Sequence, residues 1–83
     1  MANKLIKLAS KTCTPCKVVE SMLNDHDIPH ESYFIEDPKG TRLAEKYKVQ
    51  SVPTMILLDE NGAVIKIYKG IPNFTELKNK LGE

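Results

Sequence analysis

The sequence predicts a small α/β domain, a four-stranded mixed sheet flanked by three helices in the order β-α-β-α-β-β-α. Two observations lead to this prediction: apolar residues repeat at strand and helix spacings in turn, and Asn61-Gly62 between two apolar runs is a strong β-hairpin signal. A strand–helix–strand beginning requires a right-handed crossover and a parallel pair, so the later hairpin makes the sheet mixed. A length of 83 residues allows one domain, residues 1–83.

The first half of the chain predicts two strands separated by a helix. Residues 4–9 alternate loosely between polar and apolar side chains and precede a polar stretch, as a strand does. Within residues 16–25, apolar positions recur at the i, i+3, i+4 spacing of one helical face, and Pro29 follows the end of that helix. The aromatic and β-branched side chains of residues 30–35 favour a second strand.

The second half predicts a short helix, the hairpin and a last helix. We expect a turn at residues 37–40 and a helix over residues 41–48. The continuous apolar run 54–58 is typical of a strand buried on both faces, and residues 64–68 are its antiparallel partner. Asn73 is expected to cap a last helix. The inner face of this helix carries Phe74, Leu77 and Leu81.

Composition and charge exclude several classes of protein. A hydrophobic share of 41% with 28% charged residues is that of a folded globular chain. The net charge of +1 gives no electrostatic reason to expect nucleic acid or a membrane as partner. The start of the chain lacks an apolar stretch long enough for a secretory signal, so we expect a cytoplasmic protein. We also expect a monomer. The aromatic residues expected to pack in or near the core are Tyr33, Phe34, Tyr47, Tyr68 and Phe74.

The sharpest chemical signal is the run Cys13-Thr14-Pro15-Cys16, between the first strand and the first helix. The free N–H groups and the dipole of a helix N-terminus favour negative charge, so the thiol of Cys13 ionises readily and becomes the nucleophile. Pro15 is tolerated because a first-turn N–H has no helical partner. One helical turn brings Cys16 within disulfide reach of Cys13. Since cytoplasmic thiols are kept reduced, the pair indicates redox chemistry or metal binding rather than a structural disulfide.

The predicted reaction is thiol–disulfide exchange. Cys13 attacks a substrate disulfide and forms a mixed disulfide, which the more buried Cys16 then resolves. The Cys13–Cys16 disulfide is itself the redox group, so we expect no other cofactor and no metal. A purely apolar role for two buried thiols is the weaker alternative, because the motif lies at a strand–helix junction.

Beyond the dithiol, the sequence resembles thioredoxin-like proteins over nearly its whole length. Residues 43–54 look like the second signature of that family, which ends in Val-Pro-Thr, and Lys69-Gly70 matches the glycine after its final hairpin. The resemblance implies a thioredoxin-like fold in which Pro53 is cis and faces the dithiol. It also implies a groove for the substrate backbone, formed by Thr14, Pro15, Val52, Pro53 and Gly70. From the residues alone, Gly70 is a turn glycine before Pro72.

Departures from the family pattern leave the type of oxidoreductase open. Thioredoxins carry a Trp where this chain has Thr12, and a buried proton-moving Asp where it has Lys7, so that role is not transferred to Lys7. Glutaredoxins place proline directly after the first cysteine and grip glutathione with a Gly-Gly-x-Asp-type element, whereas residues 69–73 contain one glycine and no acid. We expect a thioredoxin-type reductase of protein disulfides, recycled by a thioredoxin reductase. A glutathione-dependent, glutaredoxin-like reductase is the alternative.

A zinc site is a second alternative, of a different class. Cys13 and Cys16 are followed by His26 and His30, and four such ligands can bind zinc. The spacer of nine residues is shorter than the spacer of about 12–15 residues in the common zinc-finger pattern. The predicted helix between Cys16 and His26 separates them by about 15 Å, far more than a shared metal allows. We therefore interpret both histidines as exposed polar residues beside the end of the helix.

Overall fold

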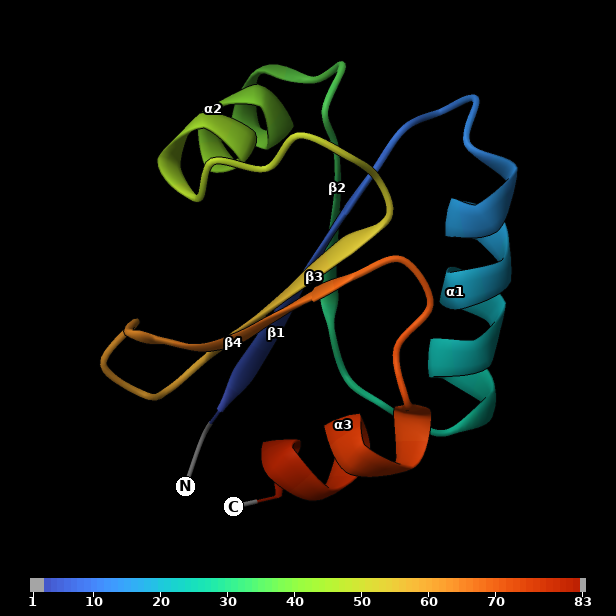
Figure 1. Cartoon of the computed structure of the whole chain (residues 1–83), viewed down its shortest axis with the longest axis vertical. Helices are drawn as coiled ribbons and strands as arrows, with labels where there is room; N and C mark the ends of the chain where they lie inside the picture. Colours follow the sequence, from blue (N-terminus) through green and yellow to red (C-terminus); the bar gives the residue numbers. More distant parts are fainter. Residues whose placement is uncertain (1–2, 83) are drawn as a thin grey trace.

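The computed structural model describes residues 3–82 as a four-stranded sheet with helices on both faces (Figure 1). The elements follow the predicted order and confirm the predicted fold class. They are β1 (Lys4–Ala9), α1 (Thr14–Asp25), β2 (Glu31–Phe34), α2 (Pro38–Lys46), β3 (Thr54–Leu58), β4 (Val64–Lys69) and α3 (Phe74–Leu81). Among the described residues, no helix is both long enough and apolar enough to cross a membrane.

The strands lie in the order β2-β1-β3-β4. β1 and β2 are parallel, with Ile6 opposite Glu31, whereas β3 is antiparallel to both β1 and β4. As a result, the end of β1, the start of β3 and the end of β4 all lie at one end of the sheet. α1 begins at this same end (Figure 1).

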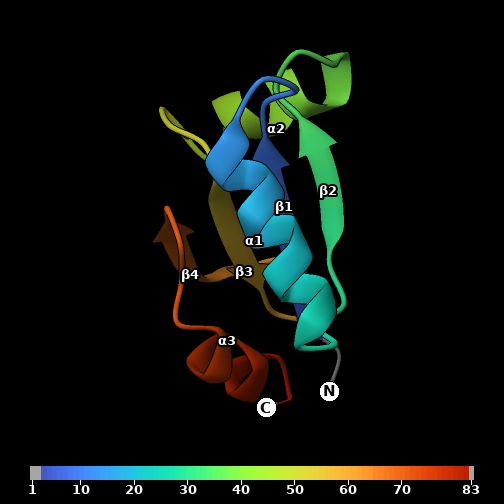
Figure 2. The same cartoon turned by 90° about the vertical axis from the view of Figure 1, so that its right-hand side faces the viewer.

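Side chains of the central strands alternate between two apolar clusters. One cluster joins the sheet to α1 and α3, and the other joins it to α2 on the opposite face, as the turned view in Figure 2 shows. The first contains Leu5, Val19, Leu23, Ile28, Met55, Leu57, Tyr68, Phe74 and Leu77. The second contains Ile6, Leu8, Ile56 and Leu58. The continuous apolar run of β3 therefore reflects burial on both faces, as predicted.

Two helix boundaries differ from the sequence prediction. The turn expected at residues 37–40 is wrong, because α2 already begins at Pro38 and ends at Lys46. Proline fixes φ near its helical value and lacks an N–H that the first turn would leave unbonded, so it starts the helix. α1 likewise begins at Thr14, two residues earlier than expected, with Pro15 in its first turn.

The expectation that Phe34 packs in the core is also wrong. Its side chain is 41% exposed, and the Lys11 ammonium lies over its ring, 5.8 Å from the centroid. Phe34 is the last residue of the edge strand β2, so it has a neighbouring strand on one side only. Tyr68 and Phe74 are buried as expected, and the other two aromatic residues are half-buried.

Candidate active site at the start of α1

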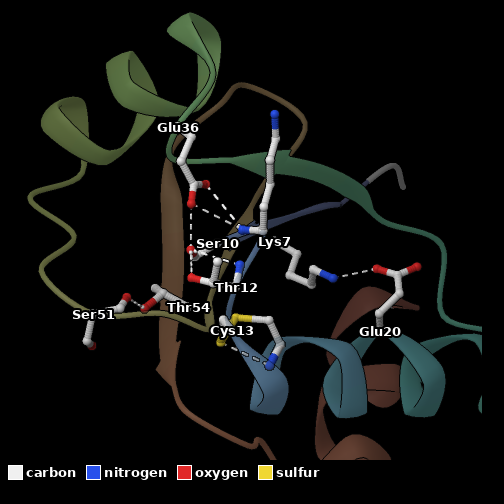
Figure 3. Close-up of a disulfide and its surroundings, with 10 residues drawn as sticks. Lys7, Ser10, Thr12, Cys13, Glu20, Glu36, Ser51 and Thr54 are labelled. Carbon is white, nitrogen blue, oxygen red and sulfur yellow. Dashed lines mark hydrogen bonds and ion pairs between the residues drawn. A yellow bond between two sulfur atoms is a disulfide. The ribbon is translucent and has the colours of Figure 1, made fainter.

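Cys13 and Cys16 form a disulfide at the first turn of α1 (Figure 3). Their Cα atoms are 5.3 Å apart. Cys13 occupies the N-cap position in extended conformation, and its Sγ accepts a hydrogen bond of 3.1 Å from the backbone N–H of Cys16. An N–H that points at Sγ stabilises negative charge there, in the same sense as the dipole of α1.

The two sulfur-bearing residues differ in accessibility. Cys13 is half-buried, whereas only 2% of Cys16 is exposed. The difference follows from position, because the N-cap residue projects beyond the helix and Cys16 lies on the face of α1 that packs against the sheet. Thr14 and Pro15, between them, are exposed. Of the two sulfur-bearing residues, Cys13 is therefore the more accessible.

Residues 10–12, which connect β1 to the dithiol, are held by Glu36. The Ser10 hydroxyl donates to this carboxylate at 2.6 Å, and the Lys11 N–H donates to both of its oxygens at 3.2 Å (Figure 3). Chiefly because of the bond from Ser10, the pKa of Glu36 lies below its ordinary value. The Cys13 N–H in turn donates to the Ser10 carbonyl at 3.2 Å, so Glu36 fixes the turn that presents Cys13. The sequence analysis did not identify this role.

The groove residues implied by the family resemblance meet at the same end of the sheet. The Val52–Pro53 peptide bond is cis, as the resemblance implies. The Pro53 carbonyl accepts a hydrogen bond of 2.9 Å from the Gly70 N–H, so the start of β3 and the end of β4 are tied together. The Thr54 hydroxyl donates to the Ser51 carbonyl at 2.7 Å and fixes the loop before the proline. A cavity of about 550 Å³ beside this loop is lined in part by Val52.

A charged cluster lies behind the dithiol, on the face of the sheet that α1 covers. The side chain of Lys7 is 5% exposed, and its ammonium lies 2.6 Å from the Glu20 carboxylate (Figure 3). Glu20 also accepts a hydrogen bond of 2.9 Å from the Ser32 hydroxyl, and His30 Nε2 lies 3.0 Å from both of its oxygens. Burial alone would raise the pKa of Glu20, but the bonds from Lys7, His30 and Ser32 together lower it to about 2.

The interpretation of both histidines as exposed residues is wrong: His26 is half-buried, and the ring of His30 is more deeply buried. Its side chain is 7% exposed, because Nδ1 donates to the Ile28 carbonyl at 2.8 Å while Nε2 faces Glu20. His26 caps the end of α1 and stacks on Phe74, with ring centroids 5.3 Å apart. α1 separates His26 from Cys16, and within residues 3–82 no three metal-ligating side chains come together.

A Cys-x-x-Cys disulfide at the N-terminus of a helix, packed on a four-stranded mixed sheet, defines a dithiol protein of thioredoxin fold. Comparison with known proteins leads to the same class. The family described as "Thioredoxin-like domain" matches residues 3–83. The chain therefore belongs to the thioredoxin-like family.

Similar proteins include a prophage-derived thioredoxin-like protein and thioredoxins of a bacterium and a plant. The SPbeta prophage-derived thioredoxin-like protein YosR of Bacillus subtilis is 34% identical over 59 residues, which cover 71% of this chain and 71% of YosR. A thioredoxin of Staphylococcus epidermidis is 29% identical over 83 residues, covering 93% of this chain and 80% of that one. A thioredoxin H-type of Fagopyrum esculentum is 29% identical over 66 residues, covering 76% of this chain and 57% of that one.

Solved structures show the same fold. A thioredoxin-like protein from Clostridium perfringens superposes with a TM-score of 0.82 at 23% identity, covering 98% of this chain and 69% of that chain. Thioredoxin-2 of a malaria parasite superposes with a TM-score of 0.81 at 18% identity, covering 98% of this chain and 82% of that chain. Together, the family, the fold and the paired cysteines support a thiol–disulfide oxidoreductase.

Proposed function

We propose that this protein is a thioredoxin-type reductase of protein disulfides, with Cys13 as the nucleophile and Cys16 as the resolving thiol. The observation that carries the proposal is the unequal exposure of the pair: Cys13 is half-buried at the N-cap, whereas only 2% of Cys16 is exposed. Only the first of these sulfurs is open to a second protein.

The proposed reaction transfers two electrons in two exchange steps. The Cys13 thiolate attacks one sulfur of the substrate disulfide, and the other substrate sulfur leaves as a thiolate that takes up a proton. The Cys16 thiolate then attacks the Cys13 sulfur of the mixed disulfide. The substrate leaves as a dithiol, and the protein is left with the Cys13–Cys16 disulfide. No further cofactor takes part.

The proposed binding groove consists of the residues around the dithiol and at the adjoining sheet end. Thr14 and Pro15 are exposed beside Cys13, whereas Val52 and Gly70 are half-buried beside Pro53. Backbone groups left unpaired beside a sheet can pair with an extended substrate segment. The proposed partners are therefore proteins that contain a disulfide, bound by a monomer, with the cytoplasm as the proposed location.

The choice of thioredoxin type over glutaredoxin type rests on the segment after β4. Gly70 is its only glycine, and no carboxylate stands between Lys69 and Asn73 to bind the amino group of glutathione. Ile71 in this segment is 61% exposed, which gives an apolar rather than an anionic surface. These features favour a protein substrate and a thioredoxin reductase as electron donor. The alternative is a glutaredoxin-like enzyme that two molecules of glutathione reduce.

The deciding experiment follows NADPH consumption during reduction of a protein disulfide such as insulin. One arm contains thioredoxin reductase, and the other contains glutathione with glutathione reductase. We expect turnover in the thioredoxin reductase arm. Turnover in the glutathione arm alone would make the protein glutaredoxin-like in practice, and no turnover in either arm would overturn the proposed function.

A further inference from the structure

Lys7 is the one charged residue buried in the sheet among residues 3–82, where 4% of it is exposed. It lies in the middle of β1, opposite Ser32 of β2 and Met55 of β3. Its strand neighbours on the same face, Leu5 and Ala9, are apolar and buried. An apolar side chain of similar length would fit such a position without the desolvation that an ammonium suffers there. The charge therefore calls for an explanation beyond packing.

Lys7 shares a cavity with the resolving cysteine. The cavity measures about 370 Å³ and is lined by Lys7, Cys16 and Glu20, with Ser32 and Phe34 on the side of β2. In the close-up, the Lys7 side chain leaves β1 on the side of the sheet that carries the disulfide and points toward Glu20, which lies one helical turn beyond Cys16 on α1 (Figure 3).

The charged groups that line this cavity come from β1, the loop after it and α1, whereas β2 contributes uncharged residues. β1 contributes Lys7, the loop before the dithiol contributes Lys11, and α1 contributes Lys17 and Glu20. His30, just before β2, contacts the Glu20 carboxylate through Nε2. Lys11 and Lys17 are exposed, so solvent and salt screen their charges. Lys7 is the buried cation of the set, and a charge in a low-dielectric interior acts more strongly on its neighbours.

We propose that Lys7 is a positioning residue for the second step of the reaction: its ammonium stabilises the thiolate that Cys16 must become before it attacks the Cys13 sulfur. Glu20 holds the ammonium in place, with His30 and Ser32 fixing the carboxylate in turn. The proton that Cys16 loses leaves through the open cavity to water. This inference rests on the proposed function, since it assigns a role within the same dithiol.

Two opposite charge changes test the electrostatic role. In a Cys13→Ser background the remaining thiol is Cys16, so thiolate absorbance at 240 nm across a pH titration reports its pKa alone. Lys7→Met leaves the Glu20 carboxylate in the cavity that Cys16 also lines, and we expect the pKa of Cys16 to rise by about 0.5–1 unit. Glu20→Gln removes the anion and leaves the cation, and we expect the pKa to fall. Shifts in the same direction, or no shift, would overturn the inference.

Two further variants test whether the shift in the pKa of Cys16 depends on the buried charge of Lys7. Lys17→Met removes an exposed lysine from the same cavity, and a shift as large as that of Lys7→Met would count against a special role of the buried cation. Lys7→Arg keeps the charge and is expected to keep the pKa of Cys16. Circular dichroism shows which variants fold. If Lys7→Met does not fold, Lys7→Gln takes its place as the variant without the charge, and an unchanged or lowered pKa of Cys16 in that variant overturns the inference.

The dithiol form gives a second readout. At a pH above the pKa of Cys16, stabilising its thiolate favours the reduced protein, so Lys7→Met is expected there to shift the equilibrium with glutathione about three- to tenfold toward the Cys13–Cys16 disulfide. The NADPH assay on the parent protein tests the proposed function independently of the role of Lys7. Turnover there, combined with no shift in the variants, overturns the role of Lys7 but leaves the proposed function standing.

Discussion

The backbone N–H of Gly70 donates a hydrogen bond of 2.9 Å to the carbonyl oxygen of Pro53. This bond joins the end of β4 to the start of β3 at the sheet end where α1 begins. Gly70 forms it with φ at +77°, in the left-handed region that glycine enters without a steric penalty. Gly70 is therefore more than a turn residue before Pro72, because its conformation holds one wall of the proposed groove.

Gly70→Ala is expected to impair both stability and activity. A Cβ at a left-handed position costs about 1–2 kcal/mol, so the free energy of unfolding in urea should fall by that amount. The rate of protein disulfide reduction should also fall, because relaxation at Gly70 moves Pro53. Gly62→Ala is the matched control, since Gly62 has φ at +86° but lies in the hairpin at the other end of β4. It should lose similar stability and keep its activity, and equal activity losses in both variants would contradict the groove.

Replacing each cysteine separately should give two different products. Cys16→Ser retains the nucleophile and lacks the resolving thiol, so it should accumulate a mixed disulfide between Cys13 and the substrate. Cys13→Ser keeps only the thiol of Cys16, a residue that is 2% exposed. This variant should neither reduce nor trap the substrate. Non-reducing gel electrophoresis with mass spectrometry of the adduct measures this. Equal trapping by the two variants would show that the roles are assigned wrongly.

Local sequence signals predicted most of the fold, because they act within a few residues. The apolar run of β3 gave its bounds of Thr54–Leu58 directly, and Asn73 caps α3 as expected, accepting a hydrogen bond of 3.1 Å from the Glu76 N–H. The start of α2 was not predicted, because proline and glycine, here Pro38 and Gly40, are typical of turns. Gly40 is in fact a helical residue placed against the backbone of β2, a contact that no local pattern reveals.

In the candidate site, too, the residues predicted from the sequence are those with local signals, and the residues missed are those with distant partners. The dithiol and its place at a helix start are contiguous in sequence, and Pro53 with Gly70 came from the family resemblance. Glu36 and Glu20 were missed because they reach Ser10 and Lys7 across 26 and 13 residues of chain. Which carboxylate meets which partner depends on the register of β1 with β2 and on how α1 lies over the sheet. Only the three-dimensional structure supplies that information.

Gly40→Ala should destabilise the protein strongly. A Cβ at this buried helical position would overlap the carbonyl group of Phe34, which is backbone and cannot move aside cheaply. Overpacking of this kind costs about 1–3 kcal/mol, measured as the loss of unfolding free energy in urea. Gly82→Ala is the control, because its Cβ would meet the Asn79 carbonyl at an ordinary 3.6 Å. Its stability should stay within about 0.5 kcal/mol of the parent, and an equal loss in both variants would contradict the close approach of α2 to β2.

Glu20 should make stability depend on pH in the acid range. Its pKa in the folded protein is about 2, below the value of about 4.3 for a free glutamate side chain. The folded state therefore binds fewer protons, so the stabilisation is fully present above about pH 4.3 and is lost as the pH falls toward 2. Because 37% of the Glu20 side chain is exposed, solvent screening reduces the effect to about 1 kcal/mol.

The measurement compares the parent with Glu20→Gln by urea unfolding at pH 7 and pH 2.5. Glutamine cannot lose a proton, so the parent should be more stable than the variant at pH 7, and the difference should shrink at pH 2.5. Glu60→Gln serves as the control, since Glu60 is exposed in the hairpin turn, and its unfolding free energy should match that of the parent at both pH values. The difference in unfolding free energy between the parent and Glu20→Gln could instead stay constant from pH 7 to 2.5. In that case the cluster of Lys7, Glu20 and His30 would stabilise the fold by side-chain packing rather than by charge.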